Sequence, residues 1–332
     1  MTDRFKLEKT EANSQAFLDL THSLYSKIEI PHTSQPKSTY LIGCYVLYDN
    51  DSVVGRFALY DNPSIRVEDK KTLALGSYEC IDDFKISVLL ITKIKETAKR
   101  LGAVKLIGPM EGSTWQNYRF TVTEQDLFFT EMCHKSYYPS QFKKSSFDVL
   151  KTYSSTLNSN IEVNENRLEH FKNRLNKQNL VIRNIDLTNF EAELITIADF
   201  SNTAFKSNFL FSEFTANSFV AKYLSIKNYV KAELFYLVEN SEGNLQGFLF
   251  CIPNYFDSKN ESIIVKSMAI LPKRNLAGLG IYLGELMYKK ALELGYSKAI
   301  HAYMINENKS IGLSNRFNAE AYKTHHLYTC DV

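Results

Sequence analysis

Hydrophobic residues recur every three or four positions in several stretches of the chain, a spacing that places them on one face of a helix. The clearest stretch carries Val88, Ile91 and Ile94 on one stripe and ends at Gly102, a residue type that commonly follows a helix. The stretches that predict helices are 15–28, 84–101, 167–178, 190–205, 214–226, 279–294 and 308–317.

Other stretches are rich in β-branched and aromatic residues and are bounded by polar turns, which is typical of strands. Two polar turns, at 49–51 and 241–244, join neighbouring strands into predicted hairpins. The predicted strands are 39–48, 53–60, 72–80, 104–107, 147–157, 233–238, 246–252, 263–271, 297–305 and 321–330.

The order of these elements occurs twice. A hairpin, a strand, a helix, a strand and a later strand follow one another in the first half, and the same order returns after residue 233. We interpret this as a structural duplication of an α/β unit with a mixed central sheet flanked by helices. The polar stretch 158–166 marks the boundary, so we expect domains at 1–157 and 185–332, joined by a linker at 158–184.

Composition excludes several classes of protein. The chain has 332 residues, is 44% hydrophobic and carries a net charge of +2, which is too balanced for a protein that coats nucleic acid. Its apolar runs are too short to span a membrane. Five scattered cysteines form no metal-binding motif, and no secretory signal is evident. We expect a cytoplasmic protein without a metal, while the oligomeric state is not predicted.

The segment with the strongest chemical signal follows the predicted strand 263–271. Lys273 and Arg274 lead into Gly278, Leu279 and Gly280, where a helix begins. Glycines allow a ligand to approach the backbone, and the amide groups at a helix start favour a phosphate. The spacing matches neither a Walker loop nor a dinucleotide-binding motif. Two glycines alone are equally well explained by tight packing at a helix start.

The surrounding residues resemble the GNAT superfamily of acyl-CoA N-acyltransferases. The resemblance rests on residues 268–272, 278–280, 299–304, 308–310 and 327–328, in the order strand, glycine loop, strand, asparagine-led helix and last strand. It covers roughly residues 185–332. One departure is that the family's Arg or Gln position falls on Asn275, with Arg274 one residue earlier.

The resemblance implies that acetyl-CoA, or another acyl-CoA, is the co-substrate. The residues expected to bind it are Met268, Ala269, Ile270, Arg274, Asn275, Leu276, Ala277, Gly278, Leu279, Gly280, Ile281, Asn308 and Ser310.

The N-terminal half resembles the degenerate half found in a bacterial subset with two GNAT-like domains. The resemblance rests on residues 105–110, 113–118 and 137–139. Its own helix start carries Asp82 and Asp83, which suit an N-cap but repel a pyrophosphate. We therefore expect one CoA site, in the C-terminal half.

Acyl transfer to an amine needs a group that accepts the amine's proton. His301 is the candidate base, although a single strand histidine is more often structural. The family's usual Tyr falls at Ser314 or Asn315, so Tyr322 and Tyr328 are the alternative acids. Trp115, the only Trp, and Tyr118 lie in the irregular stretch 108–138. We expect them to bind the acceptor, or else Trp115 anchors that stretch to the core.

The sequence thus predicts an N-acyltransferase that moves an acyl group, most simply acetyl, to the amine of a small molecule. No groove signature favours a protein or nucleic-acid acceptor. Two alternatives stay open. One is a non-catalytic acyl-CoA-binding or sensing protein, and the other is a Fem-type aminoacyl transferase, which also has tandem GNAT halves.

Overall fold

A computed structural model describes residues 4–25 and 39–332, apart from the side chain of Lys309. The helices are α1 (Gln15–Leu24), α2 (Phe84–Arg100), α3 (Tyr138–Lys144), α4 (Glu165–Leu175), α5 (Phe190–Ala204), α6 (Ala216–Leu224), α7 (Leu279–Glu293) and α8 (Lys309–Asn315). The strands are β1 (Phe5–Thr10), β2 (Leu41–Asp49), β3 (Ser52–Tyr60), β4 (Arg66–Val67), β5 (Lys70–Cys80), β6 (Lys105–Gly108), β7 (Phe120–Thr121), β8 (Asp148–Asn158), β9 (Val181–Asn184), β10 (Phe235–Glu239), β11 (Leu245–Pro253), β12 (Ser262–Ile270), β13 (Lys298–Ile305) and β14 (Glu320–Asp331).

Each helix and strand predicted from the sequence is present, with ends that differ by a few residues. Residues 26–28 of the first predicted helix lie outside the described residues. The elements that the sequence pattern did not predict include β1, β9 and α3. β1 and β9 form the two edges of the sheet and are short, so they lack the long apolar pattern of a central strand.

The halves share one topology within one continuous mixed sheet. Its strand order is β1-β2-β3-β5-β6-β14-β8-β13-β12-β11-β10-β9. In each half an antiparallel hairpin pairs with a third antiparallel strand, and that strand pairs in parallel with a fourth. The helix that links the two parallel strands is α2 in one half and α7 in the other. The predicted duplication is therefore confirmed.

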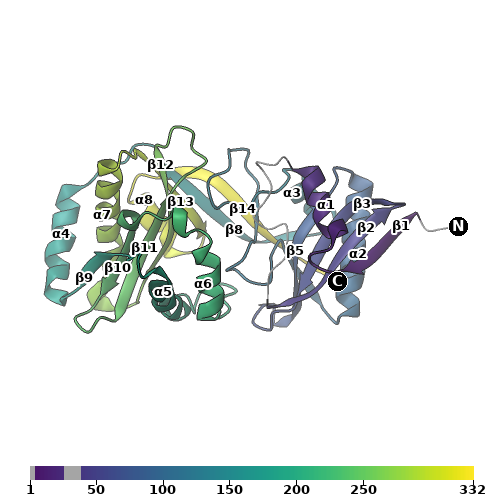
Figure 1. Ribbon diagram of the computed structural model, residues 1–332, viewed down its shortest axis with the longest axis horizontal. Helices are drawn as coiled ribbons and strands as arrows, with labels where there is room; N and C mark the ends of the chain where they lie inside the picture. The colour runs from purple at the N-terminus through teal and green to yellow at the C-terminus, as the bar shows by residue number, and fades with distance from the viewer. Residues whose placement is uncertain (1–3, 26–38) are drawn as a thin grey trace.

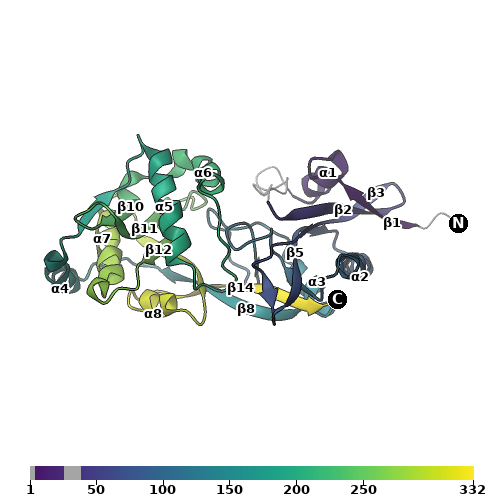
Figure 2. The ribbon, with the colours of Figure 1, turned by 90° about the horizontal axis from the view of Figure 1, so that it is seen from below.

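Two long strands join the halves (Figures 1 and 2). β8 lies between β14 and β13, while β14, the last strand of the chain, lies between β6 and β8. The strand that ends the N-terminal half in sequence thus pairs with a strand of the C-terminal half. The expected boundary near residue 158 falls at the end of β8, where the sheet itself continues.

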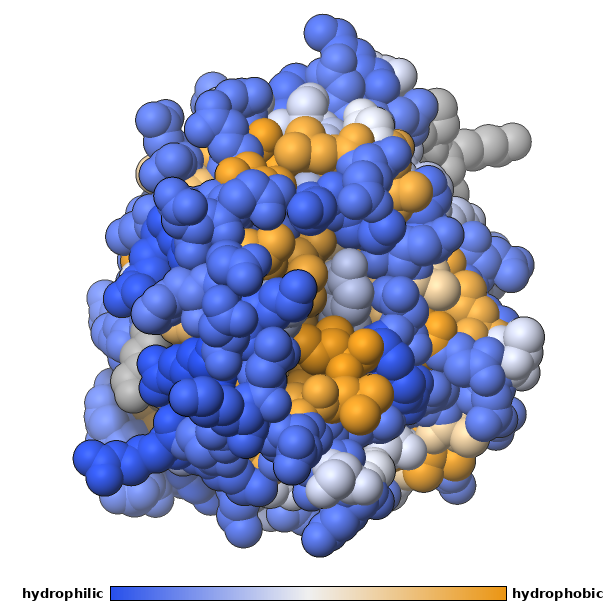
Figure 3. Space-filling view, turned by 90° about the vertical axis from the view of Figure 1, so that its left-hand side faces the viewer, coloured by the Kyte–Doolittle hydropathy of each residue, from blue (hydrophilic) through white to orange (hydrophobic). Residues whose placement is uncertain are grey.

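Helices cover both faces of the sheet in the C-terminal half. Side chains alternate along β11, so Phe248 and Phe250 pack toward α5 and α6, whereas Leu249 and Cys251 pack toward α7. α4 packs along α7 at the far end of the molecule. Figure 3 shows that end, where apolar side chains emerge in separate patches between polar ones. No helix of the described residues is long and apolar enough to cross a membrane.

Candidate active site

The parallel strands β12 and β13 separate at the centre of the C-terminal half. Their pairing ends with Val265 opposite His301. Beyond this pair, β12 continues against β11 alone, and β13 continues against β8. In an antiparallel ladder, alternate residues direct their amides away from the partner strand. The far part of β12 therefore presents backbone groups to the opening between the two strands.

A bulge in each strand accompanies the separation. On β12, Cys251 pairs with Val265 and Phe250 pairs with Ser267, so Lys266 is an extra residue without a partner on β11. On β13, the register with β8 shifts between His301 and Met304, and Tyr303 there has a φ of 59°. A non-glycine residue with such a φ costs on the order of 1 kcal/mol, and strain of this kind concentrates at functional sites.

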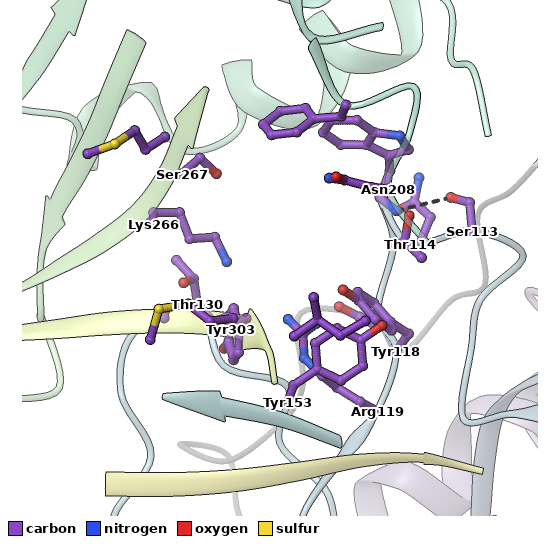
Figure 4. A pocket seen from close by; sticks show the side chains of 18 of the residues that line it. Ser113, Thr114, Tyr118, Arg119, Thr130, Tyr153, Asn208, Lys266, Ser267 and Tyr303 are labelled. Atoms are coloured by element: carbon purple, nitrogen blue, oxygen red, sulfur yellow. Dashed lines mark hydrogen bonds between the residues drawn. The ribbon is translucent and has the colours of Figure 1, made fainter. Parts of the chain in front are cut away.

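The opening leads into a cavity of about 1840 Å³, called here the central cavity. Ligand pockets are commonly about 300–1,000 Å³, so this cavity has room for more than one ligand. Most residues of the segment 111–121, together with residues 129–132, line one side of it from the N-terminal half. The loop before α6, α6 itself, β12, β13 and α8 line the other sides. Figure 4 looks into the cavity, with Lys266 pointing into it from β12 and Arg119 lying opposite, beside Tyr118 and Tyr153.

The start of α7 has the features expected of a phosphate site. Gly278, with a φ of 93°, occupies the N-cap position, and no side chain caps the helix. A Cβ on Gly280 would lie 3.2 Å from the sulfur of Met268 and 3.3 Å from Ile270. The glycine therefore lets the helix start lie close against β12. At α2 the situation is reversed, because the carboxylate of Asp83 accepts hydrogen bonds from the amides of Lys85 and Ile86.

The residues expected to bind CoA fall into three groups. Met268, Asn308 and Ser310 line the central cavity. Asn308 occupies the N-cap position of α8, yet its side chain makes no capping hydrogen bond. Capping of α8 therefore does not explain why an asparagine stands at position 308.

The second group is exposed and the third is buried. Arg274, Asn275 and Ala277 are exposed on the turn before α7. The third group is buried in the core. Its members are Leu276 on the turn, Leu279 and Ile281 on α7, and Ala269 on β12. Ile270 packs against Gly280.

His301 is held by hydrogen bonds on both sides of its ring. The hydroxyl of Tyr288 lies 2.9 Å from Nε2, and Ser314 Oγ lies 2.7 Å from Nδ1. Ser314 in turn lies 2.7 Å from Thr156 of β8. Burial lowers the pKa of His301 to about 4, because the charged imidazolium is poorly solvated there. At neutral pH this ring is uncharged and both of its nitrogens are engaged.

The two tyrosines proposed as acids are not among the residues that line the cavity. Tyr328 is fully buried in the core of the N-terminal half, where it packs against Phe120 and Phe142. Tyr322 packs near Lys323 at the start of β14. The exchange of β14 between the halves places Tyr328 beside β6 rather than beside the separated strands.

Trp115 and Tyr118 both line the central cavity. The indole N–H of Trp115 donates to the carbonyl of Ser212, 3.1 Å away, and its ring contacts Phe214 at 4.1 Å. The ring also contacts Phe205, Phe211 and Phe219. Trp115 therefore ties the N-terminal loop to α5 and α6 and forms cavity wall at the same time.

Sequence reasoning missed three cations of the cavity wall: Arg119, Lys222 and Lys266. Burial, with Lys222 and Arg119 close by, lowers the pKa of Lys266 to about 7. Lys222 donates a hydrogen bond to the carbonyl of Trp115, and its pKa is lowered to about 8. The signal for Lys266 was available in the sequence, since it interrupts an apolar strand. Arg119 and Lys222 stand in unremarkable polar contexts.

Two carboxylates of the cavity wall are engaged with their own partners. Glu131 forms an ion pair with Lys323, 2.7 Å away. Glu111 accepts hydrogen bonds from Ser77 and Asn117, and burial raises its pKa to about 7. In the part of the chain that the structure describes, no group of His, Cys, Asp and Glu side chains has the arrangement of a metal site.

Neither a family model nor a curated protein matches this sequence. Solved structures do match. A tandem GNAT protein from the clavulanic acid biosynthesis pathway aligns over 98% of both chains, with 10% identity and a TM-score of 0.53. A GCN5-related N-acetyltransferase from Sphaerobacter thermophilus aligns over 100% of this chain and 96% of its own, again with 10% identity and a TM-score of 0.53.

A third similar structure is a GCN5-related glucosamine N-acetyltransferase region in a fungal multi-domain GH3 β-N-acetylglucosaminidase. It aligns over 98% of this chain, with 13% identity and a TM-score of 0.59. This chain spans 38% of that protein's length. Together these matches show that the chain has the tandem GNAT fold.

Proposed function

We propose that this chain, whose fold is the tandem GNAT fold, is an N-acyltransferase that moves an acyl group from acyl-CoA to the amine of a small molecule. The observation that carries the proposal is the opening between β12 and β13, which leads directly into the central cavity. We take acetyl-CoA as the simplest donor. Cytoplasmic location is the expectation that accompanies it.

The residues at the start of α7 fit the phosphates of CoA. The first amides of a helix lack partners within the helix and carry a partial positive charge. Here Gly278 leaves them without a side-chain cap, and Gly280 lets the start of the helix lie close against Met268 and Ile270 of β12. The N-terminal half offers no equivalent, because Asp83 fills the corresponding place at α2.

Bound acyl-CoA would supply an acyl group activated as a thioester. The chain's own contribution is to orient it and to stabilise the charge that develops on its carbonyl oxygen. Backbone amides of residues 266–270 that face the opening are suited to this, since fixed donors need no rearrangement. Met268 and Asn308 line the cavity, and Met268 also lies beside Gly280 at the start of α7.

The amine must lose its proton to a group with a pKa near neutral. His301 fits this role poorly, because its pKa is about 4 and both ring nitrogens are engaged. On the cavity wall, Glu111 has a pKa raised to about 7. Both carboxylate oxygens of Glu111 accept hydrogen bonds of their own, so we assign neither residue as the base and describe His301 as a buried residue that links β13 to α7 and α8.

Two measurements on the full chain test the proposal. Calorimetric titration with CoA is expected to give one site per chain. Incubation with acetyl-CoA and a panel of small amines is expected to release free thiol. One CoA site without thiol release for any amine would instead support an acyl-CoA-binding protein. Binding of aminoacyl-tRNA without binding of CoA would support an aminoacyl transferase.

A further inference from the structure

Arg119 is a buried cation that lacks a full set of partners. Its side chain is only 9% exposed, and its Nη1 atom is buried without a hydrogen-bond partner. The guanidinium carbon lies 4.0 Å from the ring centroid of Tyr118 and 4.0 Å from that of Tyr303. When aromatic rings cover the faces of a guanidinium, its N–H groups can still donate hydrogen bonds at its edge. An unpaired buried donor is costly, so the site suits a ligand that supplies an acceptor.

Lys266 lies close to the same tyrosine. Its Nζ is 4.7 Å from the ring centroid of Tyr303. Arg119 and Lys266 therefore approach one ring from two different walls of the cavity, one from the N-terminal half and one from β12 (Figure 4). Lys222 adds a third positive charge on α6. Their mutual repulsion is part of the reason why the pKa of Lys266 is lowered.

The protein's own carboxylates offset this cluster only in part: Glu131 raises the pKa of Lys266 and Glu111 raises that of Lys222, but burial lowers each pKa by more. Among the described residues, none of the three cations forms an ion pair. Glu131 is paired with Lys323, and Glu307 is paired with Lys151. Two further unpartnered hydroxyls, Thr130 Oγ1 and Ser212 Oγ, belong to residues that also line the cavity. The cavity wall therefore has unused hydrogen-bond donors close to three cations that form no ion pair within the described part of the chain.

Backbone strain is found at the same place. Arg119, Thr130 and Tyr303 are cavity residues with φ values of 66°, 73° and 59°. The hydroxyl of Tyr303 donates to the carbonyl of Thr130, 3.3 Å away. Strained residues persist only where the surrounding structure holds them, and they are common at ligand sites.

We propose that the acceptor carries an oxyanion, a carboxylate or a phosphate, and that Arg119 together with Lys266 binds this group in the central cavity. The inference rests on the proposed function and names the chemical class of its acceptor. A guanidinium edge matches either oxyanion with two parallel hydrogen bonds. The amine of such a compound would extend from this anchor toward the opening between β12 and β13.

The phosphates of CoA do not account for the cluster. Gly280 packs against Ile270, four residues further along β12 than Lys266. At the rise of a strand this corresponds to about 13 Å. The candidate CoA phosphate site and the Arg119 cluster are therefore separate positions at opposite ends of the opening.

The single Trp makes the proposal measurable without a known acceptor. Trp115 lines the cavity, so its fluorescence reports on what occupies it. The probes are glutarate, inorganic phosphate and the uncharged diamide glutaramide, added to the full chain with and without saturating CoA. We expect saturable binding of glutarate or phosphate, and binding of glutaramide at least about 10-fold weaker. The ratio between the two anions distinguishes a carboxylate from a phosphate.

Arg119→Gln is expected to weaken binding of the preferred anion by roughly 10- to 100-fold. Lys266→Gln, a second variant that leaves the tyrosine stack intact, is expected to weaken it by several-fold. Arg174→Gln removes the same charge from the exposed surface of α4 and serves as the matched control, with unchanged affinity.

The proposal is overturned if glutaramide binds as well as glutarate, if Arg119→Gln and Lys266→Gln bind the anions normally, or if neither anion binds. It is also overturned if saturating CoA abolishes anion binding, since the cations would then belong to the CoA site. CoA binding is measured separately by calorimetry. Its failure alone would remove the proposed function and leave the anion site standing.

Discussion

Val265 and His301 form the last backbone pair between the parallel strands β12 and β13. Immediately beyond this pair, Lys266 bulges from β12 and Tyr303 takes a left-handed conformation on β13. Two bulges on facing strands prevent the sheet from closing again, and the space between the strands becomes part of the central cavity. One local feature therefore creates the opening, exposes amides of β12 and directs Lys266 and Tyr303 toward the central cavity.

Gly280→Glu tests the phosphate site. The new Cβ would press on Met268 and Ile270, and the carboxylate would place negative charge at the helix start. We expect the affinity for CoA to fall by about 2–4 kcal/mol, measured by calorimetry. Leu292→Glu adds the same charge at the exposed far end of α7 and should not alter CoA affinity. Unchanged affinity in Gly280→Glu would place the CoA phosphates elsewhere.

His301→Ala separates a catalytic role from a structural one. A base at this position would make turnover fall by roughly 100-fold or more with CoA affinity intact. We expect a structural effect instead. Removing the ring leaves the buried hydroxyl of Tyr288 unpaired, which should lower the free energy of unfolding by about 1–3 kcal/mol. The melting temperature should fall while folded enzyme keeps most of its turnover. Loss of turnover without loss of stability would restore His301 as the base.

The protein should lose stability in mild acid. The pKa values of His301 and His134 are lowered to about 4 by burial, below the ordinary value near 6.5. Between these values the unfolded chain binds more protons than the folded one, so stability falls as pH drops from about 6.5 to about 4. Denaturant titrations across this range measure the effect. His301→Gln should show a shallower fall, whereas His170→Gln, at an exposed position on α4, should match the unsubstituted protein.

Trp115→Ala tests the cavity wall. Loss of the ring should raise the KM for the acceptor several-fold and leave the Kd for CoA unchanged. Because the ring packs against four phenylalanines, we also expect a stability loss of about 1–3 kcal/mol, short of that for a fully buried Trp. Trp115→Phe keeps most of this packing and is the matched control. A stability loss with an unchanged KM would leave Trp115 as an anchor only.

Anion binding should depend on pH around neutrality. Lys266 faces Lys222, Arg119, Glu131 and Tyr303, and its pKa is lowered to about 7. It is charged below this pH and neutral above it, so the affinity for glutarate should rise as the pH falls through about 7.

Fluorescence titrations at several pH values measure this dependence, which Lys266→Gln should flatten. Glu111 also has a pKa of about 7, and its protonation acts in the same direction. Glu111→Gln is therefore measured alongside. An unchanged pH dependence in Lys266→Gln would exclude Lys266 as the titrating group.

The sequence by itself determined the elements and the location of the glycine loop. Helical periodicity predicted α2 and α7, and the repeated order of strands predicted the duplication, because burial against a sheet imposes these patterns on each segment separately. The N-cap role of Asp83 was likewise predictable, since a cap is a local interaction within one turn. The edge strands β1 and β9 were not predicted, because an edge strand needs little apolar surface and leaves a weak sequence pattern.

Only the tertiary structure decided which residues meet. The exchange of β8 and β14 between the halves carries Tyr328 into the N-terminal core, and no local pattern records such long-range pairing. Arg119 and Lys266 are far apart in the sequence, yet both lie against Tyr303. Their association depends on two bulges and on the docking of one half against the other. Sequence periodicity fixes which face of an element is buried, whereas the position of a charged side chain across a cavity depends on how whole layers pack.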